Sequence, residues 1–159
     1  MPKSAALQAF EPPVQLKLAM LWASVVFCYV YGDYFGLYVP GTLKSVLDGR
    51  MGPLGPTTQD VLLGTTALMA IPSLMPFACM VLKPAWNRAA NLVFGIVYSA
   101  VMALTLSGAW RFYQALGVVE ILLTLAVCWY AWKWPRPAAA NPGIRPAGNT
   151  ATPSPFSEV

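Results

Sequence analysis

Apolar residues run along the chain in four long stretches that leave no polar face for water. The stretches are Leu18 to Val39, Val61 to Leu82, Ala89 to Trp110 and Phe112 to Trp132. Each is as long as the roughly 20 residues that a helix needs to cross the hydrocarbon core of a bilayer. The only charged residues inside them are Asp33 and Glu120. The pattern therefore predicts an all-α integral membrane protein, a four-helix up-down bundle.

The composition also indicates that lipid surrounds most of this chain. Hydrophobic residues make up 57% of the 159-residue chain and charged residues only 10%, whereas a soluble domain is about 25% charged. We expect a cytoplasmic N-terminal segment at 1–16, a transmembrane domain at 17–134 and a tail at 135–159. Because the tail is rich in proline and alanine, it is predicted to be disordered. The first stretch is longer than the apolar region of a cleaved signal, so it is predicted to be retained.

Lysine and arginine are distributed unevenly between the connections, which predicts the orientation. One side holds Lys3, Lys17, Lys83, Arg88, Lys133, Arg136 and Arg145, and the other holds Lys44, Arg50 and Arg111. Short connections rich in Lys and Arg stay in the cytoplasm. Both termini are therefore predicted to be cytoplasmic.

The connections differ in length and in kind. The outer loop at 40–60 is long and rich in glycine and proline, and Thr42 to Leu47 is predicted as a short helix at the interface. The link at Lys83 and Pro84 is short, so the second and third spans should form a hairpin. Asn87 is expected to cap the third helix.

Pro72 and Pro76 lie inside the second span. Each removes a backbone donor and crowds the carbonyl four residues earlier, so a helix kink is expected. Neighbouring helices must then satisfy the freed groups. We interpret the kink as a static bend, and a hinge or a ligand-exposed carbonyl is the alternative.

The two carboxylates inside the spans are the sharpest functional signal. A charge near the bilayer centre costs about 2.5–3.5 kcal/mol on insertion scales, so it usually faces the bundle interior and has a partner. Asp33 and Glu120 both fall in the outer half of their spans, and the first and fourth helices of an up-down bundle are neighbours. The two acids are therefore candidates for one shared ligand-binding or proton-binding site. The residues expected around them are Tyr29, Tyr113, Thr124 and Arg111.

Three interpretations of this acidic pair stay open. In the first, the acids are structural, each hydrogen-bonded to a Tyr, a Thr or a carbonyl, or paired with Arg111. In the second, the pair holds or passes a proton. In the third, the pair captures a cationic or amphipathic ligand in a pocket lined by tyrosines. No spacing rule in the sequence separates them.

A secondary polar cluster of Asn87, Arg88 and Asn91 lies at the cytoplasmic entry of the third span. Arg88 is expected to reach lipid phosphate, and a specific headgroup or substrate site is the alternative. The chain has no histidine and three scattered cysteines. This excludes histidine-ligated haem or zinc and any Ser-His or Cys-His pair. We predict no catalytic residue, no metal site and no cofactor.

Several short runs of residues form a familiar pattern over most of 17 to 134. They are Tyr31-Gly32-Asp33-Tyr34, Pro40-Gly41, Thr58-Gln59, Ile71-Pro72, Met75, Asn87-Arg88, Asn91, Glu120 and Ala131-Trp132-Lys133-Trp134. The pattern resembles an uncharacterised family of small bacterial four-helix membrane proteins that carries a domain-of-unknown-function label. More distantly, the architecture resembles DoxX-like membrane proteins. The resemblance implies a four-span bundle in a bacterial inner (plasma) membrane with a set of recurring polar positions. It implies no substrate, reaction or cofactor.

Other four-span families fit the residues less well. Quinone-linked disulfide-forming proteins need a CxxC pair and di-haem cytochromes need histidines, and the chain has neither. Small multidrug exporters use one membrane-embedded glutamate, usually in the first helix, where this chain has Asp33.

Three function classes follow. We expect a non-enzymatic accessory protein or small-ligand-binding bundle. The alternative is a proton- or cation-coupled small transporter that uses Asp33 and Glu120, and that would require a dimer. An enzyme acting on a lipid or quinone ranks last. The expected partners are the lipid bilayer and a second copy or another membrane protein, without nucleic acid.

Overall fold

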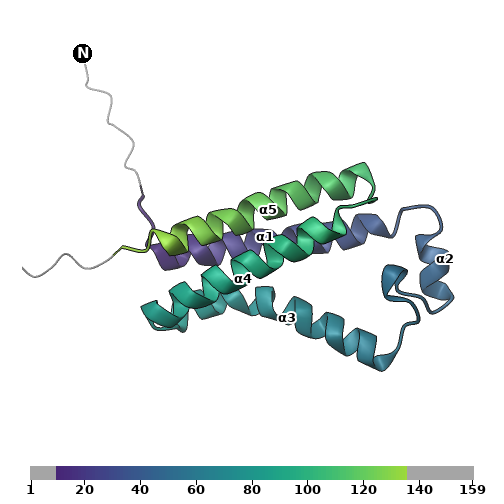
Figure 1. The fold of residues 1–159 in the computed structure, drawn as a ribbon, viewed down its shortest axis with the longest axis horizontal. Helices are drawn as coiled ribbons and strands as arrows, with labels where there is room; N and C mark the ends of the chain where they lie inside the picture. Colours follow the sequence, from purple (N-terminus) through teal and green to yellow (C-terminus); the bar gives the residue numbers. More distant parts are fainter. Residues whose placement is uncertain (1–9, 136–159) are drawn as a thin grey trace, which may run out of the picture.

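The computed structural model describes residues 10–135, which form five α-helices and one short 3-10 helix (Figure 1). The elements are α1 (Val14–Gly36), α2 (Thr42–Leu47), η1 (Gly52–Leu54), α3 (Gln59–Val81), α4 (Pro84–Thr105) and α5 (Arg111–Trp132). Four of these helices, all except α2, are long and apolar enough to cross a membrane. The predicted all-α membrane bundle is confirmed, and so is the short helix at Thr42 to Leu47.

The four long helices do not pack as a closed ring. α1 packs against α5 and α3, and α4 packs against α5, whereas α3 and α4 touch only sparsely. Figure 1 shows α3 leaving the other three helices as it approaches α2. The prediction that the first and fourth spans are neighbours is confirmed. The predicted hairpin of the second and third spans has its tight turn, but its helices splay apart.

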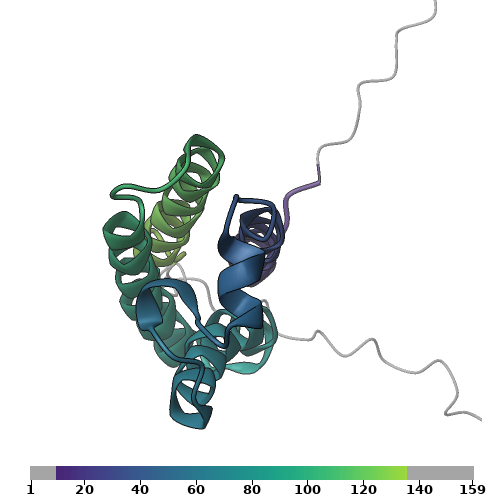
Figure 2. The same ribbon diagram turned by 90° about the vertical axis from the view of Figure 1, so that its right-hand side faces the viewer.

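The two ends of the bundle differ in character. The end that carries α2 and the α4–α5 turn is called the α2 end below, and Figure 2 shows α2 in front of α1 at this end. The opposite end, with the α3–α4 turn, is called the basic end. Its cations within the described residues are Lys17, Lys83, Arg88 and Lys133.

Some helix bounds differ from the expected spans. α1 ends at Gly36 instead of Val39, and α4 runs five residues earlier at both ends than the predicted span of 89 to 110. Pro84 starts α4 because the first helical position needs no backbone N–H. Gly108, with φ of 75°, turns the chain before α5. Residues 1–9 of the expected N-terminal segment and 136–159 of the expected disordered tail lie outside the described residues.

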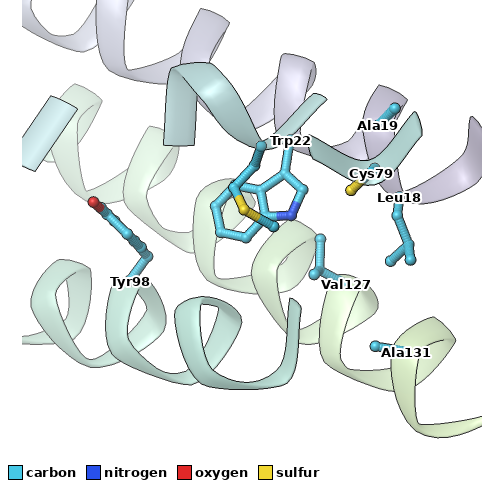
Figure 3. Packing of buried hydrophobic residues seen from close by; sticks show 8 residues of the cluster. Leu18, Ala19, Trp22, Cys79, Tyr98, Val127 and Ala131 are labelled. Carbon is cyan, nitrogen blue, oxygen red and sulfur yellow. The ribbon is translucent and has the colours of Figure 1, made fainter. Parts of the chain in front are cut away.

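The hydrophobic core, whose packing is shown in Figure 3, is formed mainly by residues from the half of each long helix nearer to the basic end. Its buried members are Leu18, Ala19, Trp22, Met75, Cys79, Tyr98, Val127 and Ala131. They come from all four long helices. The rings of Trp22 and Tyr98 meet edge to face with centroids 5.9 Å apart, a favoured aromatic geometry. The helices are therefore held together mainly at this end.

A buried hydrogen-bond network joins α1, α3 and α4 inside this core. Asn91 Oδ1 accepts from Trp22 Nε1 at 2.8 Å, and Asn91 Nδ2 donates to Asn87 Oδ1 at 2.7 Å. Asn87 Nδ2 donates in turn to the Cys79 carbonyl at 2.6 Å. The prediction that Asn87 caps its own helix is wrong, because α4 begins before it and has Lys83 as its N-cap without a side-chain bond. Asn87 instead satisfies a carbonyl in the last turn of α3, which has no partner within its own helix.

Arg88 joins α4 to α5 at the basic end. Its Nε donates to the Ala131 carbonyl at 3.1 Å, and its guanidinium carbon lies 5.9 Å from the ring centroid of Trp132. These contacts satisfy the end of α5 and place a cation at a helix C-terminus, where the helix dipole favours it. The expected contact of Arg88 with lipid phosphate stays a prediction.

Glycine allows α4 and α5 to approach closely. A Cβ on Gly95 would lie 2.6 Å from Cys128 Sγ and 3.2 Å from the Thr124 carbonyl oxygen. A Cβ on Gly117 would collide with the Leu106 side chain. Small residues at such positions are the usual means by which helices in membranes pack.

Candidate functional site

A cavity of about 120 Å³ lies among the four long helices, toward the α2 end of the packed core. Its acidic and tyrosine side chains are Asp33, Glu120, Tyr29, Tyr98 and Tyr113. The rest of the wall is mostly apolar and consists of Gly32, Leu68, Met69, Val101, Met102 and Thr105. The structure therefore places both predicted acids, and both predicted tyrosines, on the wall of one cavity.

Glu120 is the most unusual residue of this wall. It lies in the middle of α5 on the same face as Gly117 and Thr124, and only 3% of it is exposed. Its Oε2 is buried and has no hydrogen-bond partner among the described residues. A buried charged group without a partner costs several kcal/mol, so such groups are rare in folded proteins.

Asp33 sits nearer to the α2 end and is exposed. Besides the cavity, it lines a second, wider groove of about 500 Å³ that is walled partly by α2 and η1. Cavity and groove also share Gly32, Thr105 and Tyr113. Asp33 therefore lies on the walls of both the groove at the α2 end and the cavity that also contains Glu120.

Three tyrosines line the same cavity as the two acids and contribute aromatic rings and hydroxyl groups to its wall. The ring centroids of Tyr29 and Tyr98 are 6.5 Å apart. The ring of Tyr113 packs over Gly32, since a Cβ added to Gly32 would lie 3.7 Å from Tyr113 Cε2. Aromatic faces attract cations, and carboxylates do so more strongly.

Tyr98 forms the boundary between the cavity and the core, and sequence reasoning did not include it in the site. Its hydroxyl donates to the Leu68 carbonyl, which is the group four residues before Pro72. Proline has no N–H to offer that carbonyl, so Tyr98 satisfies it from α4. For Pro72, this confirms the expectation that a neighbouring helix supplies the missing donor. Tyr98 lies on the same buried face of α4 as Asn91 and Gly95. That spacing is the sequence signal that could have placed it in the site.

Two predicted site residues lie elsewhere. Thr124 is buried one turn beyond Glu120, where its hydroxyl is 2.6 Å from Ser99 Oγ and donates to the Glu120 backbone carbonyl at 2.9 Å. It joins α5 to α4 and does not line the cavity. Arg111 is the exposed first residue of α5 and is also absent from the cavity wall. Neither residue therefore lines the cavity beside the two acids, and their expected role in binding stays a prediction.

The polar groups on the cavity wall are mainly acidic and phenolic. Among the described residues, no group of three or more His, Cys, Asp or Glu side chains comes together that could hold a metal ion. The cavity offers two carboxyl groups, tyrosine hydroxyls and aromatic faces. These groups complement a positive charge.

Comparison with known proteins identifies a family and no relative of known function. The model of a family of unknown function (DUF6326) matches residues 8–141. No curated protein and no solved structure matches the chain.

Proposed function

We propose that this chain, which belongs to that family of unknown function (DUF6326), is a multi-pass membrane protein that binds a small ligand carrying a positive charge. The observation that supports this most directly is the Glu120 carboxyl, which is buried at the cavity wall with one oxygen unpaired. A cationic group in the cavity would supply the missing partner.

The size and lining of the cavity define the ligand class. A volume of about 120 Å³ has room for a few water molecules or a small ammonium group. Two carboxyl groups at one cavity favour a cation over a neutral molecule or an anion, because charge interactions are strong in a poorly solvated interior. The tyrosine rings favour an alkylammonium, since its methylene or methyl groups pack on aromatic faces.

Access to the cavity favours the α2 end. The groove beside Asp33 opens there, whereas the core around Trp22 and Asn91 fills the basic end. By the positive-inside rule, we assign the basic end and both termini to the cytoplasm of a bacterial inner membrane. The ligand would then enter from the non-cytoplasmic side.

The test is binding of a probe cation to the full-length protein in nanodiscs. We use n-butylammonium, with n-butanol as the uncharged probe of similar length. Butylammonium should raise the thermal unfolding midpoint of the wild type, because a ligand that binds only the folded state stabilises it. Glu120→Gln, which keeps the shape but removes the charge, should abolish the shift.

The control for this variant is Asp48→Asn, since Asp48 is an exposed acid after α2 and outside the cavity. It should keep the full shift. A wild type that responds equally to butanol, or a Glu120→Gln protein that still responds to butylammonium, would refute the proposal.

A proton- or cation-coupled transporter is the alternative. It is favoured by the position of Asp33 between groove and cavity, which sets two acids along one route. A second copy or another membrane protein would have to complete the path, because the basic end of one copy is filled by its core. Proteoliposomes that take up butylammonium in response to a pH gradient, and lose uptake in Asp33→Asn, would favour transport over binding alone.

A further inference from the structure

We propose that the basic end carries a binding site for one anionic phospholipid, in a groove formed by α1, the residues just before it and Tyr130 of α5. This groove has a volume of about 410 Å³. The lining residues that matter are Phe10, Leu16, Lys17, Met20, Leu21 and Tyr130. The site is separate from the acidic cavity and does not depend on the function proposed for that cavity.

The shape of the groove suits an acyl chain. Its wall along α1 extends from Leu16 through Met20 to Ser24, which is about 12 Å at 1.5 Å per residue. Those three positions are four residues apart, so they lie on one face of the helix. The wall along α1 is apolar apart from Lys17 at its basic end and Ser24, whose hydroxyl donates to the Met20 carbonyl at 3.0 Å. One acyl chain laid against this face would cover it.

Lys17 places a positive charge at the basic end of this groove. It lies in the first turn of α1, near the membrane boundary, and its Nζ is 5.6 Å from the ring centroid of Tyr130. An aromatic ring holds a cation in place without neutralising its charge. Lys17 therefore presents an ammonium at the depth where a phosphate would sit above an acyl chain in the groove.

The rest of the basic end selects for negative charge. Within the described residues, this end holds one acid, Glu11, and four cations: Lys17, Lys83, Arg88 and Lys133. Two more of these cations also lie against rings of α5, with Lys133 Nζ 4.1 Å from Trp129 and the Arg88 guanidinium 5.9 Å from Trp132. The charge at this end thus stays available to lipid. An anionic headgroup is preferred over a zwitterionic one, as at other basic membrane surfaces.

The experiment measures lipid retention by native mass spectrometry. The full-length protein is released from nanodiscs that contain phosphatidylglycerol and phosphatidylcholine in equal amounts. We expect the wild type to retain one phosphatidylglycerol in preference to phosphatidylcholine. Lys17→Gln should reduce the retained phosphatidylglycerol about fivefold, the effect of one lysine near an anionic surface.

Two further variants make the result specific to the groove. Lys83→Gln removes a cation at the same end that does not line the groove, and it should retain the lipid. Met20→Trp fills the groove from an exposed position and should release the lipid with the charge unchanged. Equal loss in Lys17→Gln and Lys83→Gln, unchanged retention in Met20→Trp, or equal retention of the two lipids by the wild type would each overturn the proposal.

Discussion

Replacing Gly95 by alanine tests whether the close approach of α4 and α5 holds the bundle together. The added Cβ would lie 2.6 Å from Cys128 Sγ and 3.2 Å from the Thr124 carbonyl oxygen. The first distance is far below van der Waals contact, and the second involves backbone that cannot turn away. The helices must therefore separate or tilt to accept the methyl group.

The expected magnitude is the difference between two opposing effects. Overpacking of a close-packed contact costs about 1–3 kcal/mol. Glycine to alanine inside a helix returns about 0.5–1 kcal/mol, because alanine loses less backbone entropy on folding. Gly95→Ala should therefore lower the free energy of unfolding by about 1 kcal/mol, and by at most about 2.5 kcal/mol.

A second substitution separates the steric effect from any general effect on helix formation. Cys128→Ala removes the sulfur that lies closest to the new methyl group. The double variant should thus be more stable than the sum of the two single changes predicts, by about 1 kcal/mol in the range typical of directly coupled residues. The remaining loss reflects the contact with the Thr124 carbonyl.

The measurement is equilibrium unfolding in mixed micelles with increasing sodium dodecyl sulfate, followed by circular dichroism. Gly64→Ala is the matched control, because Gly64 also lies inside a helix and a Cβ there meets nothing within 4 Å. It should be neutral or slightly stabilising. The packing argument fails if Gly95→Ala is as stable as Gly64→Ala, or if Cys128→Ala and Gly95→Ala combine additively.

Two further variants test the buried hydrogen bonds in the same unfolding assay. Asn91→Leu should cost about 1–3 kcal/mol, since it leaves the indole N–H of Trp22 buried without its acceptor. Tyr98→Phe should cost about 1–3 kcal/mol, because the Leu68 carbonyl loses its donor. Adding Pro72→Ala should recover much of that loss, since the alanine N–H can bond the same carbonyl within α3.

A control variant and a refuting outcome distinguish the roles proposed for the Tyr98 and Asn91 hydrogen bonds. Tyr34→Phe removes a hydroxyl that is exposed and paired only with Tyr38, so it should change stability little. If Tyr98→Phe behaves like Tyr34→Phe, or if Pro72→Ala destabilises the Tyr98→Phe protein further, the Tyr98 hydroxyl does not compensate for the missing N–H of Pro72. An Asn91→Leu protein as stable as the wild type would show that the network contributes little.

The sequence by itself determined the number of spans and much of their polar pattern. Hydrophobic length is a local property, and a helix in lipid satisfies its backbone within its own segment. The four long helices and the short α2 could therefore be predicted without knowledge of their neighbours. An up-down bundle places its first and fourth helices side by side, so the pairing of α1 with α5 could be predicted as well. The short connection between α3 and α4, in contrast, did not make those two helices pack closely.

Tertiary structure decided which polar groups meet. Asn87 was expected to cap its own helix and instead bonds a carbonyl of α3, and Arg111 lies outside the cavity that holds the two acids. Such outcomes depend on how far each helix rotates and tilts. The rotation and tilt follow from contacts between helices, such as Gly95 against Cys128, that no single segment contains. The splay of α3, and with it the cavity that leaves Glu120 unpaired, exists only once all four long helices are in place.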